Sequence, residues 1–290
     1  MSASTDPVLP EALRVDYGRE VALTRNPNRG IHVAAVVGTT VLTPTMVRVT
    51  LGGDEVRALT PVSPDQRVKI FLPADGLVWE GDPPTETVPW MLPRGSIRPR
   101  HRTYTVRYLD PAAGTFALDV AVHDGGVGSA WATQAEPGQR VSFIGPVSRW
   151  SLRPETRHLV LVADETGLPA VAAIAASLPA GLTARAVVEV PSAASRQPLP
   201  SPAAIEVTWF HADEAPPGGP DRVATTVAGL GLEPGTTQVW GGAEQATIRA
   251  VRHHLLVERG FTRDDVYLLA YWRRGVAEEA AFADPREHHD

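Results

Sequence analysis

Apolar and polar residues alternate with a period of two between residues 31 and 145, in short runs that turn residues separate. In one such run Val47 and Val49 face one side and Arg48 faces the other, as in a half-buried strand. This alternation predicts six strands, at residues 31–37, 46–51, 67–72, 102–109, 115–122 and 140–144. Residues 73–99 carry many prolines and little periodicity, so we expect an irregular excursion there. Together these runs predict a small antiparallel barrel or sandwich with a solvated outer face.

Beyond residue 154 the pattern changes to continuous apolar runs that alternate with helix-like stretches. Such runs are typical of a parallel sheet that is covered on both faces. We expect strands at residues 158–163, 184–190, 206–211, 237–240 and 266–271, and helices at 168–178 and 244–258. The sequence therefore predicts two domains, a six-stranded antiparallel β-barrel over residues 30–150 and an α/β parallel-sheet domain over residues 151–280.

The composition excludes several kinds of chemistry. The 290 residues include no cysteine, which rules out disulfides, thiolate nucleophiles and cysteine-bound metal clusters, so any redox reaction needs a bound cofactor. A net charge of -6 and scattered basic residues argue against nucleic-acid binding. Residues 1–14 lack an apolar signal-peptide core and no run of about 18 apolar residues occurs, so we expect a cytoplasmic protein without membrane insertion.

The first candidate site lies on the predicted strand at 102–109, which begins Arg-Thr-Tyr-Thr-Val-Arg. This hexapeptide resembles the flavin-binding signature of the ferredoxin-reductase superfamily, in the form that siderophore-interacting proteins show. The resemblance implies FAD contacts from Arg102, Tyr104, Thr105, Val106 and Arg107. An arginine can pair with the FAD diphosphate, a tyrosine can form an aromatic wall beside the flavin, and a threonine hydroxyl can hydrogen-bond the ring. An ordinary exposed strand also contains such residues, so this segment alone leaves both interpretations open.

A glycine-rich stretch follows the strand at 115–122 and leads into a short helix that we expect to start near Ser129. Glycines before a helix N-terminus let backbone N–H groups approach a phosphate. Here the resemblance implies FAD contacts from Val122, His123, Gly126, Gly128, Ser129, Ala130 and Trp131. Asp124 stands where the family has glycine, which adds a carboxylate beside the expected diphosphate. A plain turn is the alternative for this segment.

Further candidate residues follow in the family's order. Asp164 and Thr166 come directly after a predicted strand, where open α/β sheets bind ligands, although Thr166 also suits a helix N-cap. The resemblance implies cofactor contacts from Asp164, Thr166, Gly242, Glu244, Tyr271 and Trp272. Core tryptophans and solvated polar residues are the alternative at the C-terminal positions.

The ordered matches run from about residue 31 to residue 275, and by them the chain is identified as a member of the siderophore-interacting family. The resemblance implies a ferredoxin-reductase-like fold, FAD on the barrel, NADPH or NADH on the α/β domain, and a ferric siderophore as electron acceptor. We expect Lys69, Arg48, Arg273 and Arg274 to supply cationic contacts to the chelate. No catalytic residue is expected beyond the flavin itself.

Several alternatives stay open. The acceptor can instead be a protein partner or a quinone, or the chain can bind flavin or siderophore without turnover, since Asp124, Ala243 and Ala270 depart from the family pattern. The sequence does not decide between NADPH, NADH and reduced ferredoxin as donor, or between monomer and dimer. No metal site is expected, because His253 and His254 are adjacent on a helix and should point apart.

Overall fold

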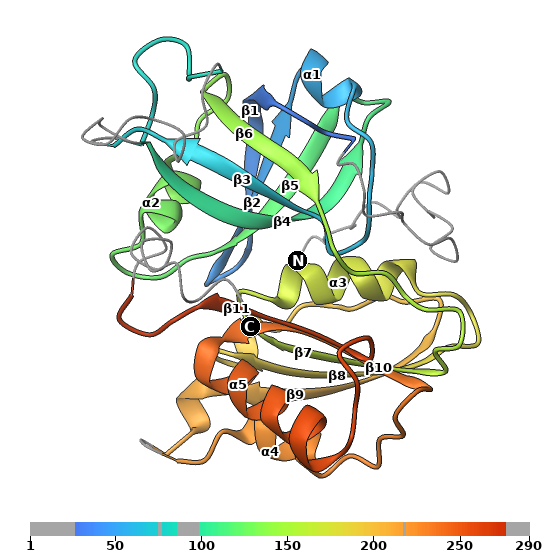
Figure 1. The fold of residues 1–290 in the computed structure, drawn as a ribbon. Coiled ribbons are helices and arrows are strands. Elements are labelled where there is room, and N and C mark those ends of the chain that lie inside the picture. Colours follow the sequence, from blue (N-terminus) through green and yellow to red (C-terminus); the bar gives the residue numbers. More distant parts are fainter. Residues whose placement is uncertain (1–26, 75–76, 86–98, 217–218, 277–290) are drawn as a thin grey trace, which may run out of the picture.

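The computed structural model describes residues 27–74, 77–85, 99–216 and 219–276. Figure 1 shows a barrel above and an α/β domain below. The barrel strands are β1 (Ile31–Thr43), β2 (Met46–Gly52), β3 (Arg67–Leu72), β4 (Arg100–Asp110), β5 (Thr115–Ala121) and β6 (Arg140–Val147). They pair antiparallel and close in the order β1-β2-β5-β4-β3-β6, so the predicted six-stranded barrel is confirmed.

Apolar side chains from all six barrel strands fill its interior. Val49 of β2, Leu118 of β5 and Phe143 of β6 are completely buried in one cluster. Two short helices accompany the strands, α1 (Asp54–Arg57) and α2 (Val127–Gln134). Trp131 of α2 is 1% exposed and belongs to the same cluster, so α2 is anchored to the barrel core and its N-terminus is held in place.

The second domain is built on a five-stranded sheet. Its strands are β7 (His158–Asp164), β8 (Thr183–Val190), β9 (Ala204–His211), β10 (Thr237–Glu244) and β11 (Val266–Trp272). All neighbours pair in parallel, in the order β11-β10-β7-β8-β9, which confirms the predicted parallel-sheet domain. The helices are α3 (Leu168–Ser177), α4 (Arg222–Ala228) and α5 (Gln245–His253), with a π-helical turn at His254–Glu258 and 3₁₀ turns at Ala193–Ser195 and Ala212–Glu214.

Helices cover both faces of this sheet. Ile174 of α3 packs in one buried cluster with Leu161 of β7, and Val251 of α5 packs in another with Val162 of β7. Consecutive residues of β7 thus face opposite clusters, as the continuous apolar runs predicted. Figure 1 shows α3 between the sheet and the barrel, where it contacts β4. Among the helices that the structure describes, none is long and apolar enough to cross a membrane.

Some local expectations differ from the structure. The outer face of the barrel is not uniformly solvated, since Arg48 is 8% exposed and Phe71 is completely buried. The alternation within one strand carries no information on what packs against its outer face, which explains the error. The sequence also gave no signal for α4, whose two threonines lower helix propensity and whose start is capped by Asp221. Residues 75–76 and 86–98 of the expected excursion lie outside the described residues.

Candidate functional site

The two barrel segments with candidate FAD residues lie side by side. The ring of Tyr104 on β4 stacks near that of Trp131 on α2, with centroids 6.4 Å apart and planes 28° apart. A Cβ atom on Gly128 would lie 1.9 Å from the Tyr104 hydroxyl oxygen and 3.4 Å from Cγ of Arg102. Any larger residue at 128 would displace this tyrosine. Glycine therefore lets β4 and the N-terminus of α2 form one surface.

A solvent-open hollow of about 520 Å³ lies against the start of α2. It is lined by Leu77, Arg100, Val122, His123, Asp124, Gly125, Gly126, Val127, Ser129, Ala130, Thr133 and Gln134. Gly126 is the N-cap and has no side chain to bond the first-turn N–H groups, which suits an anion there. Ser129 fixes the loop, because its hydroxyl accepts the His123 N–H at 3.0 Å. The predicted residues Val122, His123, Gly126, Ser129 and Ala130 thus share one hollow, with Asp124 at its wall.

Two buried hydroxyl groups meet where the barrel faces the sheet domain. Thr105 on β4 and Tyr271 on β11 come close enough to interact, yet neither oxygen makes a well-formed hydrogen bond within the described residues. Burial raises the pKa of Tyr271 to about 12, so its hydroxyl stays protonated. The two hydroxyls satisfy each other only poorly, and a further polar group beside them would complete their hydrogen bonding.

Asp164 ties together the carboxyl ends of three strands. Its Oδ1 accepts the Thr166 N–H at 2.8 Å and the Thr166 hydroxyl at 2.5 Å. Its Oδ2 accepts the Glu244 N–H at 2.8 Å and Nε1 of Trp272 at 2.6 Å. Burial raises the pKa of Asp164 and these four donors oppose the rise. The structure therefore brings together predicted residues from β7, β10 and β11, and Asp164 positions them through contacts within the protein.

Close backbone approach completes this strand-end cluster. A Cβ atom on Gly167 would lie 1.9 Å from the carbonyl oxygen of Gly242, so the turn after β7 touches the end of β10. A Cβ atom on Gly242 would lie 2.8 Å from the ring of Tyr271. The same ring meets Trp240 edge-on, with centroids 6.3 Å apart. The position of the Tyr271 ring thus depends on two glycines and a core tryptophan.

Three charged residues at the domain junction were not predicted. Asp65 accepts Nε1 of Trp240 at 3.3 Å, and Arg67 donates to the Tyr267 hydroxyl at 3.1 Å. Burial raises the pKa of Asp65, and the nearby Arg67 opposes this rise. Glu165 accepts a hydrogen bond from the Thr45 hydroxyl across the same junction. No sequence pattern marks these residues, because their partners lie in the other domain.

The outer barrel wall holds a buried ionic cluster. Arg48 on β2 donates from Nε to Oδ1 of Asp119 at 2.6 Å and from Nη2 to Oδ2 at 2.9 Å. Nε of Arg107 lies 3.9 Å from the same carboxylate. The expectation that Arg48 is an open cationic contact is therefore corrected, since its fork is occupied by Asp119. Val106 is also buried, in the barrel core.

The other predicted cations lie nearer to solvent. Lys69 is half-buried on β3, while Arg273 and Arg274 are exposed just after β11. The backbone N–H of Arg274 donates to Oε1 of Glu244 at 3.2 Å, which holds this segment beside the end of β10. Arg273 and Arg274 thus lie next to the strand-end cluster, whereas Lys69 belongs to the barrel.

The expectation that His253 and His254 point apart is wrong. Nε2 of His253 lies 3.5 Å from Oε1 of Glu258, and Nδ1 of His254 lies 2.7 Å from its Oε2. The π-helical turn that begins at His254 widens the helix and lets both rings reach one carboxylate.

The comparisons with known proteins identify the family. Residues 35–150 match the model of the siderophore-interacting FAD-binding domain, and residues 156–275 match that of the siderophore-interacting protein. The chain belongs to the siderophore-interacting protein family. An uncharacterized protein of Mycobacterium tuberculosis is 32% identical over 265 residues, which cover 87% of this chain and 93% of that protein. Ferric vibriobactin reductase ViuB of Vibrio cholerae is 26% identical over 244 residues, 81% and 86% of the two chains.

Solved structures of the family share this architecture. A siderophore utilization protein from T. fusca has a TM-score of 0.76 and 34% identity, with 87% of this chain and 96% of that chain covered. The siderophore-interacting protein SipS from Aeromonas hydrophila has a TM-score of 0.73 and 29% identity, with 90% and 98% covered. The ferredoxin reductase of carbazole 1,9a-dioxygenase, at 18% identity and a TM-score of 0.61, covers 83% of this chain and 69% of its own, and shows that the fold is ferredoxin-reductase-like.

A further relative shares part of the chain. The NADPH-dependent ferric-chelate reductase of Escherichia coli is 34% identical over 123 residues, which cover 42% of this chain and 47% of that protein.

Proposed function

We propose that this protein reduces ferric siderophores, with NADH or NADPH as electron donor and FAD as the intermediate carrier, and so releases Fe(II). The observation that carries the proposal is the pair of hydroxyls of Thr105 and Tyr271, which are buried within reach of each other where the barrel meets the sheet domain and make no well-formed hydrogen bond. A ring with hydrogen-bonding edges would satisfy such a pair. Relatives named as a ferric vibriobactin reductase and a ferric-chelate reductase support the same reaction.

The described residues fit FAD in three respects. Gly126 and Gly128 leave the N-terminus of α2 without side chains of its own, since a Cβ atom there would meet His123 or Tyr104, and the bare backbone suits the diphosphate together with Arg102. Tyr104 supplies an aromatic face beside that backbone. The Thr105 hydroxyl is the candidate partner for the flavin ring. Asp124 adds a negative charge at the wall of the hollow and weakens the binding of the diphosphate.

When bound, FAD would accept two electrons as a hydride from the nucleotide and would pass them on one at a time, each to one Fe(III). The residues of this chain need no acid or base for these transfers, and their task is positioning. Asp164 holds the Trp272 indole through a 2.6 Å hydrogen bond, and the Gly242 backbone sets the place of Tyr271. Tyr271 lies against Thr105 of the barrel, whereas Trp272 stays partly exposed at the end of β11.

The nicotinamide nucleotide is assigned to the carboxyl ends of β7 and β10. The strand order reverses between these two neighbours, and open α/β sheets bind ligands at such a point. The predicted residues Asp164, Thr166, Gly242 and Glu244 gather there. Exposed Arg273 and Arg274 beside this cluster are the proposed contacts for an anionic chelate, together with Lys69. The cysteine-free composition fits work in the reducing cytoplasm.

An anaerobic visible absorption titration tests the proposal. The protein is reconstituted with FAD, given NADH or NADPH, and then given a ferric siderophore. Bound flavin bands that bleach with the nucleotide and return with the chelate are expected. A protein that binds no FAD contradicts the proposal at its first step, and bleaching that only a quinone or a protein acceptor reverses would assign a different acceptor.

A further inference from the structure

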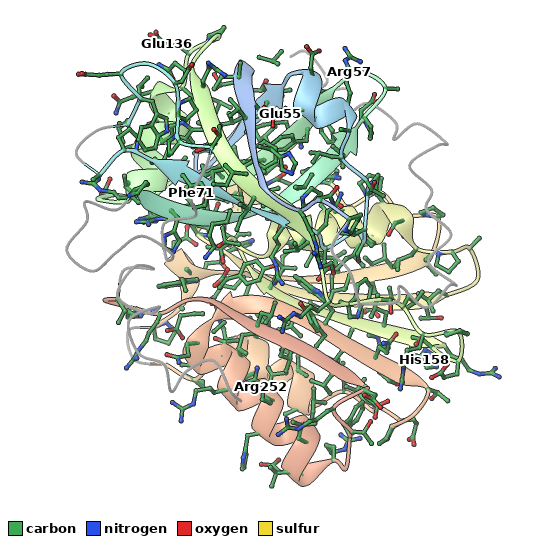
Figure 2. All side chains as sticks on the ribbon, turned by 45° about the horizontal axis from the view of Figure 1, so that its top comes forward. Glu55, Arg57, Phe71, Glu136, His158 and Arg252 are labelled. Carbon is green, nitrogen blue, oxygen red and sulfur yellow. The ribbon has the colours of Figure 1, made fainter. Side chains whose placement is uncertain are left out.

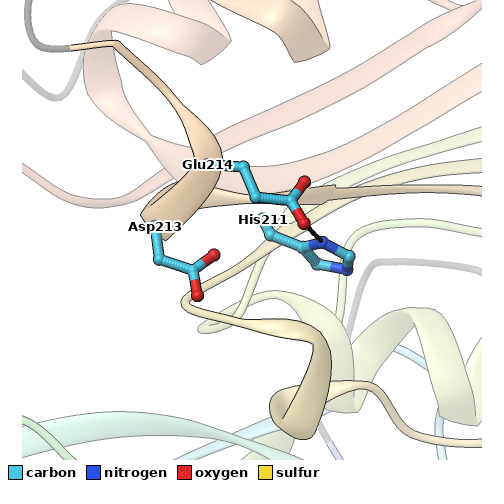
Figure 3. Close-up of side chains that lie close together, drawn as sticks. All are labelled: His211, Asp213 and Glu214. Carbon is cyan, nitrogen blue, oxygen red and sulfur yellow. Dashed lines mark ion pairs between the residues drawn. The ribbon is translucent and has the colours of Figure 1, made fainter.

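A cluster of charged side chains lies at the carboxyl ends of β8 and β9, away from the strand-end cluster around Asp164. We call this cluster the β8–β9 edge. It consists of Glu189 from β8, Arg196 from the following loop, His211, Asp213 and Glu214 at the end of β9, and Arg222 at the start of α4. Figure 3 shows the His211 ring facing Glu214, with Asp213 alongside. None of these residues has a task in the proposed reaction so far.

The internal contacts of the β8–β9 edge orient its two arginine side chains. Nη2 of Arg222 donates to Oε1 of Glu189 at 2.8 Å and to the carbonyl oxygen of His211 at 2.5 Å. Nε of Arg196 donates to Nε2 of His211 at 2.8 Å. The edge therefore contains two guanidinium groups, of Arg196 and Arg222, and three carboxylates. The nearby His211 ring lowers the pKa of Glu214, so this group stays ionised and the edge has a net negative charge.

A metal ion is not the occupant that this geometry favours. The candidate ligand atoms of His211, Asp213 and Glu214 do lie within 4.8 Å of one another. However, Nε2 of His211 accepts a hydrogen bond from Arg196, so the ring proton sits on Nδ1 and faces Glu214 at 2.9 Å. The lone pair of Nε2 is then used by Arg196, and Nδ1 carries the proton, so neither ring nitrogen can bind a cation. In a metal-bound histidine one nitrogen binds the ion and the other donates its N–H to an acceptor.

The position of the edge relates it to the nucleotide site. The sheet order places β8 and β9 next to β7, on the side opposite to β10 and β11. With the nicotinamide near Tyr271 at the β11 end, the adenosine half would extend along the carboxyl ends toward β8 and β9. Glu189 is the second-to-last residue of β8, about 20 residues after Gly167, and dinucleotide-binding folds place the group that meets the adenosine ribose at such a position.

We infer that the β8–β9 edge makes this protein select NADH over NADPH, an inference that rests on the proposed use of a nicotinamide donor. The two nucleotides differ only by a 2′-phosphate on the adenosine ribose. A 2′-hydroxyl donates readily to a carboxylate such as that of Glu189. A 2′-phosphate carries about two negative charges and would meet Glu189, Asp213 and Glu214, whose three carboxylates outnumber the two guanidinium groups of Arg196 and Arg222.

The test measures kcat/KM of the FAD-reconstituted protein for both nucleotides. Asp213 and Glu214 are exposed, so the double variant Asp213→Asn/Glu214→Gln should fold, and glutamine keeps an acceptor for His211. Removing two like charges should raise the NADPH-to-NADH ratio of kcat/KM by about tenfold or more. Glu206→Gln is the matched control, since Glu206 is an exposed glutamate near the opposite end of β9 and pairs with Arg185. This control should leave the ratio unchanged.

A binding measurement separates this inference from the proposed function. Calorimetry on the same protein compares 5′-AMP with 2′,5′-ADP, which differ by the 2′-phosphate alone. Weaker binding of 2′,5′-ADP, relieved in the double variant, supports selection by the edge even if neither nucleotide bleaches the flavin. The inference is overturned if the wild-type protein prefers NADPH, if it binds both fragments equally, or if Glu206→Gln shifts the ratio as much as the double variant does.

Discussion

Glu165 makes the contact between the two domains sensitive to pH. It follows β7, and its carboxylate accepts a hydrogen bond from Thr45 in the turn between β1 and β2. Oγ of Ser195, in the loop after β8, lies 2.8 Å from the Thr45 hydroxyl. Burial raises the pKa of Glu165 from 4.5 to about 7, with Thr45 opposing the rise and the negative charge of Asp164 adding to it. The carboxyl group therefore titrates near neutral pH in the folded protein.

The sign of the effect on stability follows from this pKa. Because the folded protein holds the Glu165 proton more tightly than the unfolded chain, the contribution of Glu165 to stability is complete below pH 4.5. It is lost as the pH rises through about 7. The full shift corresponds to about 3 kcal/mol, at about 1.4 kcal/mol per pKa unit. Since the side chain is only partly covered, solvent screening reduces the expected loss to about 1–2 kcal/mol.

The variant Glu165→Gln tests this reasoning, because glutamine stays neutral and keeps an acceptor for Thr45. Urea unfolding at pH 5.5 and pH 8.5, followed by tryptophan fluorescence, should show the wild type losing about 1 kcal/mol more stability than the variant, because part of the full loss already occurs below pH 5.5. Histidine titrations occur in both proteins and cancel in the difference. Glu136→Gln is the control, since Glu136 is exposed on the side of the barrel away from the sheet domain (Figure 2). An identical loss in Glu165→Gln and wild type would refute the argument.

Two further substitutions test the barrel. Gly128→Ala should displace Tyr104 and weaken FAD binding at least about tenfold in a fluorescence titration, whereas Gly38→Ala, with open space around its Cβ position, should not. Equal affinities would show that glycine at position 128 does not matter for FAD. Asp119→Asn should destabilise the protein by about 3 kcal/mol in urea unfolding, because it leaves the buried Arg48 charge uncompensated. A loss below about 1 kcal/mol would mean that water reaches this ion pair.

The fold was largely readable from the chain because its signals are local. The alternation of apolar and polar residues predicts that Val49 and Leu118 lie inside the barrel. The continuous apolar run of β7 predicts a strand that packs against helices on both faces of the sheet. The error at Arg48 has a different cause. Its environment is set by Asp119, 71 residues further along the chain, and the pattern of β2 alone cannot report such a partner. The π-helical turn after His253 was missed for a similar reason, since hydrophobic periodicity does not distinguish it from an ordinary α-helical turn.

The candidate site likewise contains residues that the sequence predicts and residues that only the structure reveals. The segments around Tyr104 and Gly128 were found as sequence motifs, and the structure adds that a glycine is needed there because the tyrosine hydroxyl occupies the space of a side chain. Asp65, Arg67 and Glu165 carry no motif and are recognised only once the two domains are placed together. Their signal is tertiary, because each is a charged group whose partner is supplied by the other domain.

This concentration of buried polar groups at the domain junction has a consequence for the proposed reaction. Burying Asp65 and Glu165 costs desolvation free energy, and the contacts that Trp240 and Thr45 make across the junction offset part of this cost. Apolar contacts would tolerate sliding of one domain over the other, whereas these directional contacts oppose it. Electron transfer between two ring systems held by different domains depends on such a fixed orientation. The directional contacts of Asp65 and Glu165 therefore hold the two domains at a fixed angle, which the proposed electron transfer needs.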